Sequence, residues 1–368
     1  VTSNGEYRMK ECVTATPHYN CIQYDNGLCK LHKKYGEQFL PDVCRTFPRS
    51  HKRLDKRFLV TANLACPETV RIALYNDKED AFAFPQEAIT QPYTKPGVPD
   101  AKRRELEHTA NETLFSLFNY TTAQVNDPRF SADASMARLV LFGSDLDRHP
   151  PDSWFALKEK LFERYTGDYI VQQAKARDRS GHVRTGDALY DLAEAYADRL
   201  GYMRTGDVLH TLLELAFGLL NRDRPRYNEL LAMVKVQLGD HSDTKKTLIT
   251  NYNKIKAPWE AHYRAQLEPV LKNLIKALVS YHVFPIACTF RKKSHTIVSI
   301  ALHYLLVKLF LMCGCYASGS TLDVTGVVDV VQPLSKRVYV RDKQKVYTFC
   351  KENGWGNIHK VVAILLDF

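Results

Sequence analysis

Four cysteines near the start of the chain have the residue type and the number that a metal centre needs. Cys21, Cys29, Cys44 and Cys66 are separated by seven, fourteen and twenty-one intervening residues. Four thiolates complete a tetrahedral zinc site or hold an iron–sulfur cluster. Zinc fingers and ribbons bring two ligands together as Cys-x2–4-Cys, and these four contain no such pair. The cysteines therefore predict a metal site, and their spacing alone leaves the metal open.

Residues beside the cysteines favour a cluster over zinc. Pro67 follows Cys66, removes a backbone donor and stiffens the loop beside a ligand. Asp55 alone opposes the positive side chains of residues 45–57, which are Arg45, Arg49, Lys52, Arg53, Lys56 and Arg57. A cluster with four thiolates is net negative, so nearby guanidinium groups would stabilise it and tune its potential. The competing interpretation is a solvated basic face around structural cysteines.

Other residues could extend the ligand set. His32 and His51 lie among the cysteines, and Cys12 precedes them. Such histidines more often support ligands by hydrogen bonds or lie at the surface, so they and Cys12 rank below the four cysteines. The remaining cysteines lie in or near apolar segments, where free cysteine is usually a small buried hydrophobe: Cys288, Cys313, Cys315 and Cys350.

The composition narrows the class of protein. Nine cysteines are an odd number, whereas the disulfide framework of a secreted protein is usually even-numbered and dense. Since no leader opens the sequence, we expect a reducing, cytoplasmic location. The net charge of +10 suits nucleic acid, anionic membranes or acidic proteins. The chain has no long block of Lys and Arg, which disfavours nucleic acid.

The elements that must position these residues divide the chain into three predicted parts. Residues 1–80 are rich in Cys, His, Lys and Arg but poor in apolar runs, so a metal would supply their folding free energy. Residues 81–105 contain four prolines and are typical of a linker. Residues 106–368 show helical periodicity. The predicted fold class is therefore mainly α, with an N-terminal cysteine-rich metal-binding module before a helical body.

The sequence predicts the secondary structure of several segments of the helical body. Apolar residues repeat at helical spacing after Trp154, and again after Pro269, which suits a first helical turn. Two further segments are predicted helices, Asp207–Leu220 and Ile358–Leu366. Phe58–Ala62 is a candidate strand, whereas Val324–Val331 fits either a helix or a strand.

The most apolar stretch, Thr296–Ala317, is long enough to span a bilayer. It contains His303 and Lys308, and each ionisable group at such depth costs several kcal/mol, on the order of 3 for a lysine. We therefore expect a buried core helix and no membrane association.

One sequence is nearly repeated. Gly181–Leu189 is GHVRTGDAL, and Gly201–Leu209 is GYMRTGDVL. Either copy could be a turn in which Thr or Asp caps the next helix and Gly relieves the backbone. The alternative is a pair of anion-binding helix starts. Two copies do not make a solenoid, and the structural interpretation is favoured.

The cysteine segment resembles the flagellin lysine N-methylase family. It reads NCIQYDNGLCKLHKKYGEQFLPDVCRTFPRSHK and then LACPE. The positions that match the family pattern are Cys21, Leu28, Cys29, Gly36, Leu40, Cys44, Phe47, Pro48, Arg49, Cys66, Pro67 and Glu68. The match is strong over residues 20–70, and the helical remainder, including VSYHVFP, resembles the family only loosely.

The sequence departs from the family at two places. The family usually has further cysteines upstream, including an adjacent pair, which this chain does not show. Its aromatic-Ser-Arg stretch followed by His is replaced here by Leu334, Ser335 and Lys336, with Val340 near the His position.

The resemblance implies methyl transfer from S-adenosylmethionine to lysines of flagellin, with an iron–sulfur cluster, of 4Fe–4S type, held by the four cysteines. The chain has neither the Gly-x-Gly-x-x-Gly turn of Rossmann methyltransferases nor the Cys-x3-Cys-x2-Cys spacing of radical enzymes. An amine is nucleophilic without radical help, so the cluster is either structural or an anchor for the donor's amino-acid end. Arg45, Arg49 and Glu68 are the candidate donor-binding residues, and no general base is assigned.

An acidic row is a weaker candidate for contact with the substrate lysine. Asp191, Glu194 and Asp198 fall on one side of a predicted helix, which is usually just a solvated face.

Two other classes of function compete with the methylase. In the first, zinc or a cluster only stabilises a helical module that binds protein or nucleic acid. Such a non-catalytic scaffold need not bind S-adenosylmethionine. In the second, the cluster transfers electrons or senses redox state, which requires a reversible couple without methylation.

The cysteine hypothesis predicts the behaviour of two variants. Cys44→Ala or Cys66→Ala should lose bound metal and destabilise the first seventy residues, because metal binding and folding of such a segment are coupled. Iron, sulfide and zinc analysis after anaerobic purification measures the first effect, and limited proteolysis the second. Wild-type metal content and stability in both variants would contradict the hypothesis.

Overall fold

The computed structural model is mainly α-helical in its described part, which confirms the fold class predicted for the body. The described residues are 24–25, 28–54, 57–75, 116–150, 153–154, 160, 205–219, 225–285, 292–340, 348, 352, 355 and 358–368. The helices are α1 (Lys30–Tyr35), α2 (Asp42–Thr46), α3 (Pro67–Tyr75), α5 (Ala132–Arg148), α9 (Thr205–Leu213), α10 (Pro225–Gln237), α11 (Lys245–Pro258), α12 (Arg264–His282), α13 (Lys293–Ser318), α14 (Val324–Val340) and α16 (Ile358–Asp367).

Short strands and irregular helical turns complete the described elements. Two antiparallel hairpins pair β1 (Tyr24–Asp25) with β2 (Leu28–Cys29), and β3 (Arg49–Leu54) with β4 (Arg57–Ala62). The irregular turns are the 3-10 segment η2 (Glu37–Phe39) and the π-helical segments η5 (Glu214–Leu219) and η6 (Trp259–Tyr263). β4 confirms the predicted strand, and Val324–Val331 proves to be helical as part of α14.

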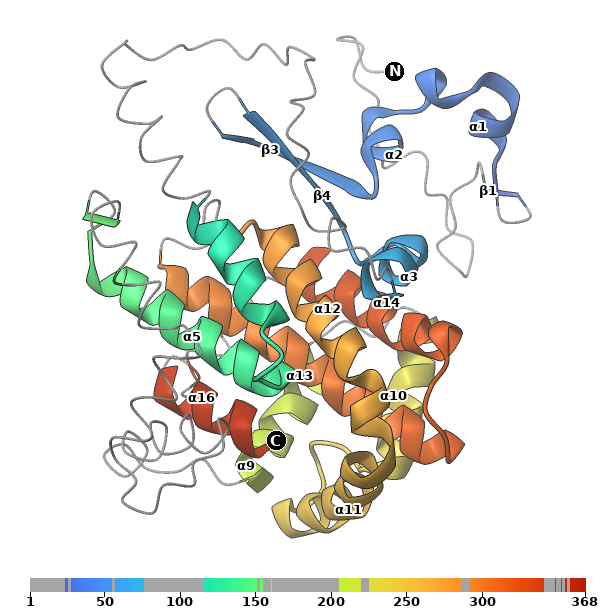
Figure 1. The fold of residues 1–368 in the computed structure, drawn as a ribbon. Helices are drawn as coiled ribbons and strands as arrows, with labels where there is room; N and C mark the ends of the chain where they lie inside the picture. The colour runs from blue at the N-terminus through green and yellow to red at the C-terminus, as the bar shows by residue number, and fades with distance from the viewer. Residues whose placement is uncertain are drawn as a thin grey trace.

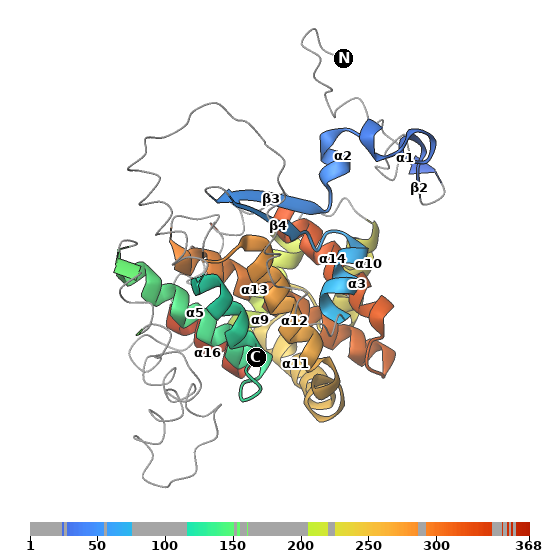
Figure 2. The same ribbon diagram turned by 45° about the horizontal axis from the view of Figure 1, so that its top comes forward.

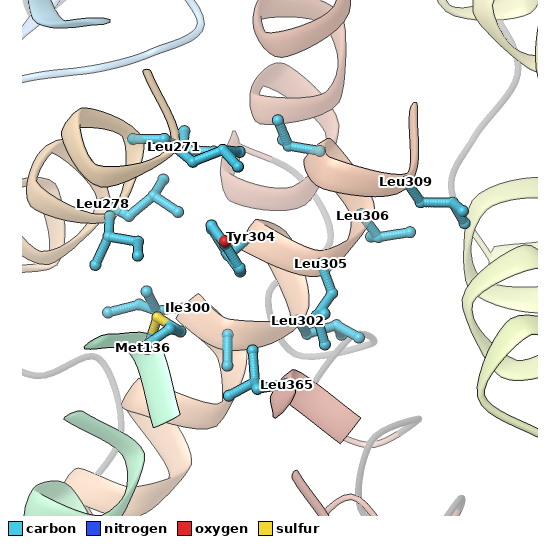
Figure 3. Close-up of a cluster of buried hydrophobic side chains, with 14 of the residues drawn as sticks. Met136, Leu271, Leu278, Ile300, Leu302, Tyr304, Leu305, Leu306, Leu309 and Leu365 are labelled. Carbon is cyan, nitrogen blue, oxygen red and sulfur yellow. The ribbon is translucent and has the colours of Figure 1, made fainter. Parts of the chain in front are cut away.

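Helix α13 forms the centre of the body, with α5, α10, α12, α14 and α16 packed around it (Figure 1). Figure 3 shows Ile300 of α13 next to Met136 of α5 and Leu302 near Leu365 of α16, while Leu306 and Leu309 point to the other side of α13. Among the described helices α13 is long and apolar enough to cross a membrane, yet 94% of its most apolar window is buried inside the fold. The expected buried core helix is therefore confirmed.

The helix expected to begin at Pro269 begins earlier, so this prediction was wrong. α12 starts at Arg264 and follows η6 and α11 without a break, which places Pro269 inside the helix. The apolar repeat located the buried face at Leu271 and Leu274 correctly. It did not locate the start, because the preceding residues are helical too and Leu267 continues the same buried face before the proline.

The other helix predictions hold where they can be examined. α9 and η5 together cover Asp207–Leu220 up to residue 219, and α16 covers Ile358–Leu366. Trp154 is buried, and its Nε1 donates to the carbonyl oxygen of Leu146 at 3.1 Å. The rest of that predicted helix, the linker at 81–105 and the first repeat copy lie outside the described residues. The proposed domain boundaries therefore stay predictions.

The described part of the second repeat copy, residues 205–209, opens α9, which packs against α11. A Cβ added at Gly206 would lie 2.9 Å from Cδ1 of Ile249, so the end of the Ile249 side chain would have to shift to admit it. Beside it, Lys245 Nζ contacts Asp207 Oδ1 at 2.5 Å. Gly206 and Asp207 of this copy thus contribute to the contact between α9 and α11.

A second close contact joins α5 to the core helix α13. A Cβ at Gly143 would lie 2.8 Å from Cγ2 of Ile297 and 3.2 Å from Cζ of Phe284. Ile297 is β-branched and fully buried, so it has little freedom to move aside.

Gly143→Ala should therefore lower the free energy of unfolding by about 1–3 kcal/mol, the usual cost of overpacking a core. Gly218→Ala is the matched control, because the atom nearest to its added Cβ is Glu214 Cγ at 3.9 Å. The control should leave stability within about 1 kcal/mol of wild type or raise it. Urea unfolding measures both variants, and a Gly143→Ala protein as stable as its control would contradict the packing argument.

Candidate functional site

The turn that carries Cys66 connects β4 to α3 and is fixed by its own backbone. Asn63 Oδ1 accepts a hydrogen bond from the Ala65 amide at 2.8 Å, and the Cys66 amide donates to the Asn63 carbonyl oxygen at 3.1 Å. The Cys66 carbonyl oxygen in turn accepts from the Val70 amide at 3.1 Å. Pro67 takes the first helical position of α3, where a missing amide hydrogen costs nothing. The backbone is therefore held on both sides of a half-buried cysteine.

The same turn is attached to the helical body by side chains from two helices. Asn63 Nδ2 donates to Tyr281 Oη of α12 at 3.2 Å, and Gln332 Nε2 of α14 donates to the Ala65 carbonyl oxygen at 2.8 Å. Leu64 and Ala65 are buried between these contacts. In Figures 1 and 2, α3 lies against α12 and α14. The turn that contains Cys66 is thus attached to the helical body through α12 and α14.

The end of α12 that provides Tyr281 has a strained backbone. Val283 adopts φ 50° and ψ 46°, a left-handed conformation that is rare for a β-branched residue. Its amide donates to the Ser280 carbonyl oxygen at 3.0 Å, and its side chain is fully buried. His282 is also buried, and its ring lies edge-on to Tyr281. Packing holds such strain in place, and strained residues cluster at functional sites.

The other predicted ligands lie on separate small elements. Cys29 is the N-cap residue of α1 and half-buried, and Cys44 lies exposed in α2. α1 ends at Tyr35 and is capped by Gly36, whose φ of 86° favours glycine and explains that match to the family pattern. Both views place α1 and α2 apart from α3. Cys21 lies outside the described residues, as does Cys12.

The donor chemistry suits a thiolate-bound metal, because the residues are cysteines and none of Cys29, Cys44 and Cys66 is fully buried. Their arrangement does not assemble one. Within the described ranges, no three His, Cys, Asp or Glu side chains gather closely enough to hold a metal ion. The four-cysteine ligand set therefore stays a prediction.

The candidate donor-binding residues all lie beside predicted ligands. Arg45 follows Cys44 at the end of α2, and Arg49 opens β3; both are exposed. Glu68 lies in the first turn of α3, where Arg71 Nη2 contacts its Oε1 at 2.6 Å. The hydrogen bond from Arg71 lowers the pKa of Glu68. The structure does not bring the three residues into one described pocket.

Of the lesser candidates, His32 is exposed in α1 and His51 lies in β3. The acidic row at residues 191–198 lies outside the described residues. Cys313 and Cys315 are buried in α13 as expected, and burial raises the pKa of the Cys313 thiol to about 12. Cys288 and Cys350 lie outside the described residues.

Sequence reasoning missed a charged cluster inside the core. Asp133, at the start of α5, accepts hydrogen bonds from Tyr304 Oη at 2.8 Å, Lys308 Nζ at 2.8 Å and Arg264 Nη2 at 3.0 Å. Tyr304 and Lys308 are fully buried in α13. Burial, and then the negative charge of Asp133, hold the pKa of Tyr304 well above its ordinary value. Lys308 was noticed as an ionisable residue in an apolar stretch, but its partner lies 175 residues earlier.

Two carboxylates border this cluster. Glu260 contacts Arg264 Nη1 at 2.7 Å, and Glu268 accepts from the Ala132 amide at 2.5 Å. Burial opposes the charge on Arg264, but Asp133 and Glu260 outweigh it and raise the pKa of the guanidinium group. Burial, supported by Asp133, raises the pKa of Glu268. The cluster joins α5, α12 and α13 through one aspartate.

Another buried pair joins α13 to α14. Ser335 Oγ lies 3.2 Å from His303 Nε2, and both residues are fully buried. Burial lowers the pKa of His303 to about 3, so the ring is neutral at pH 7. Ser335 lies in the stretch where the sequence departs from the family pattern, and here it contacts a residue of the neighbouring core helix.

Removal of one partner from the core cluster should be costly. Asp133→Asn leaves the Lys308 ammonium buried without a carboxylate, and we expect a loss of about 3–5 kcal/mol in the free energy of unfolding. Lys308→Met should cost less, because Arg264 and Tyr304 still contact Asp133. The double variant should lose less than the sum of the two.

Denaturant unfolding of this double-mutant cycle measures the coupling. The exposed pair of Arg226 and Asp329, 3.8 Å apart, is the control, and Arg226→Met should cost only about 0.2–1 kcal/mol. Additive losses for Asp133→Asn and Lys308→Met would contradict a coupled buried pair.

Comparison with known proteins gives one match. The family model for the FliB lysine N-methylase C-terminal domain matches residues 122–364, which spans the core from α5 to most of α16. No curated protein matches the chain. No solved structure matches it either.

Proposed function

Because the chain belongs to the FliB lysine N-methylase family, we propose that it transfers methyl groups from S-adenosylmethionine to lysine side chains of flagellin. The family match carries this proposal, because it covers about two thirds of the chain, 243 of 368 residues counted from 122 to 364. The cysteine motif before residue 70 is an independent point of resemblance to flagellin lysine N-methylases.

The transfer is a displacement at carbon. The lysine Nζ forms a bond to the methyl carbon as the bond from carbon to the sulfonium sulfur breaks. The donor leaves as S-adenosylhomocysteine, and the nitrogen loses one proton. The amine must be neutral to react, so its pKa of about 10.4 has to be lowered or its proton removed in the complex. Alignment of the amine with the methyl group is then mainly a matter of positioning.

We further propose that Arg45, Arg49 and Glu68 bind the amino-acid end of the donor. Two guanidinium groups suit its carboxylate, and a carboxylate suits its ammonium group. Glu68 now holds Arg71, so the donor's ammonium group would have to displace that exposed ion pair. Such exposed ion pairs contribute only about 0–1 kcal/mol in water. Breaking the pair between Glu68 and Arg71 would therefore reduce the binding free energy of the donor only slightly.

We also propose that Cys21, Cys29, Cys44 and Cys66 hold an iron–sulfur cluster. All three donor-binding candidates lie within five residues of a predicted ligand in the sequence. A bound cluster would order this cysteine segment and place a charged centre beside the donor's polar end.

The methylation assay tests the proposal directly. The full chain, purified anaerobically, is incubated with flagellin and S-adenosylmethionine that carries a labelled methyl group. We expect methyllysine in flagellin by mass spectrometry and one S-adenosylhomocysteine for each methyl group transferred. Reactions without donor and with lysine-blocked flagellin are the controls. An iron-loaded chain that binds the donor but methylates nothing would contradict the methyltransferase proposal. An iron-loaded chain that binds no donor would also contradict it and would favour the scaffold.

Donor affinity tests the three binding residues. Arg45→Gln, Arg49→Gln and Glu68→Gln should each weaken binding by about tenfold or more, the loss expected for a hydrogen bond to a charged group. Arg226→Gln is the control for the two arginines, because Arg226 is also an exposed basic residue and lies on α10 beside Asp329. Calorimetric titration measures each Kd. Equal affinity in all four variants would reject this donor site.

A further inference from the structure

The Cys66 turn differs from the rest of the cysteine segment in how it is held. Side chains from two helices of the body contact the residues just before Cys66, through the bond from Asn63 to Tyr281 and the bond from Gln332 to Ala65. Tyr281 and Gln332 both lie within the family-matched region, whereas Cys66 lies outside it. These contacts therefore join the family domain to the cysteine segment.

The contacts leave the turn little freedom. Leu64 and Ala65 are 2% and 5% exposed, and the two hydrogen bonds beside them join half-buried side chains to this buried pair. Tyr281 comes from the last turn of α12, which Val283 ends in its strained conformation. Cys66 itself stays half-buried, so its sulfur remains within reach of a ligand. The body therefore fixes the backbone while the thiol stays available.

We propose that Tyr281 and Gln332 are positioning residues that hold Cys66 as the metal ligand fixed to the helical domain. This rests on the proposed metal site. Cys29 and Cys44 come from small elements outside the body, so the metal would tie that segment to the domain at Cys66. A ligand that is already held in place loses less freedom when it binds. Groups that support metal ligands typically change affinity by about 10–100-fold.

Isosteric variants separate this role from general stability. Tyr281→Phe removes the acceptor for Asn63, and Gln332→Glu removes the donor to Ala65. The matched control is Asn273→Asp, because Asn273 Nδ2 donates to the Leu74 carbonyl oxygen at 2.9 Å in the same interface, away from Cys66. Each variant loses one hydrogen bond between the helical body and either the Cys66 turn or α3. We therefore expect similar melting temperatures for all three variants.

The first measurement is the rate at which a chelator removes metal from the anaerobically loaded full chain. We expect Tyr281→Phe and Gln332→Glu to release iron about 10–100-fold faster than wild type, and Asn273→Asp to release it at the wild-type rate. Wild-type rates in the first two variants, or an equal increase in the control, would overturn the proposal.

The second measurement needs no metal. In the metal-free chain, alkylation located by mass spectrometry should be faster at Cys66 in Tyr281→Phe and Gln332→Glu than in wild type or Asn273→Asp. The rates at Cys29 and Cys44 should not change. Unchanged alkylation at Cys66 would overturn the proposal even if a variant failed to take up metal.

The outcomes also separate this inference from the proposed function. A wild-type chain that methylates flagellin and holds iron, with variants that retain it equally well, rejects the positioning role alone. A chain that releases iron as expected but never methylates flagellin rejects the enzyme and supports the positioning role. A wild-type chain that binds neither iron nor zinc rejects the ligand role of Cys66 together with the proposed cofactor.

Discussion

The ammonium group of Lys308 is fully buried in the middle of helix α13, and the helices around it are placed so that its charge is neutralised. An isolated charge at that depth would cost several kcal/mol even after relaxation, so a counter-charge must reach it. Asp133 does so from the start of α5, and Arg264 joins the same carboxylate from α12. A buried ion pair adds little net stability, but its geometry permits few alternatives. One aspartate therefore fixes how α5, α12 and α13 lie against each other.

This constraint extends to the functional segment through α12. The helix contacts the charge cluster at its first residue, Arg264, and the Cys66 turn at its penultimate residue, Tyr281. α14 provides the second contact to that turn through Gln332 and is tied to α13 by Ser335 and His303. The predicted metal ligand that the body holds is thus supported by the helices that surround α13. The cysteine segment and the family domain meet at this place.

The helical body and the cysteine segment have different roles in the proposed reaction. A methyl transfer to an amine requires no electrons, so it demands a rigid site and a neutral nucleophile before anything else. The family-matched region provides the rigid part, with a core of buried helices. The cysteine segment provides the basic and thiolate groups that suit a charged donor and a metal. A firm junction at Cys66 would make these two parts one site.

The sequence by itself determined the helical class, the strand at β4, the buried nature of α13 and the family, which the match over residues 122–364 confirms. These features depend on local periodicity, composition and motif order, which a linear sequence contains. Only the tertiary structure decided that Asp133 partners Lys308 and that α12 begins before Pro269. It also decided that Cys66 is held by α12 and α14, apart from α1 and α2. Partners far apart in the chain are chosen by the packing of helices, and no local pattern encodes that choice.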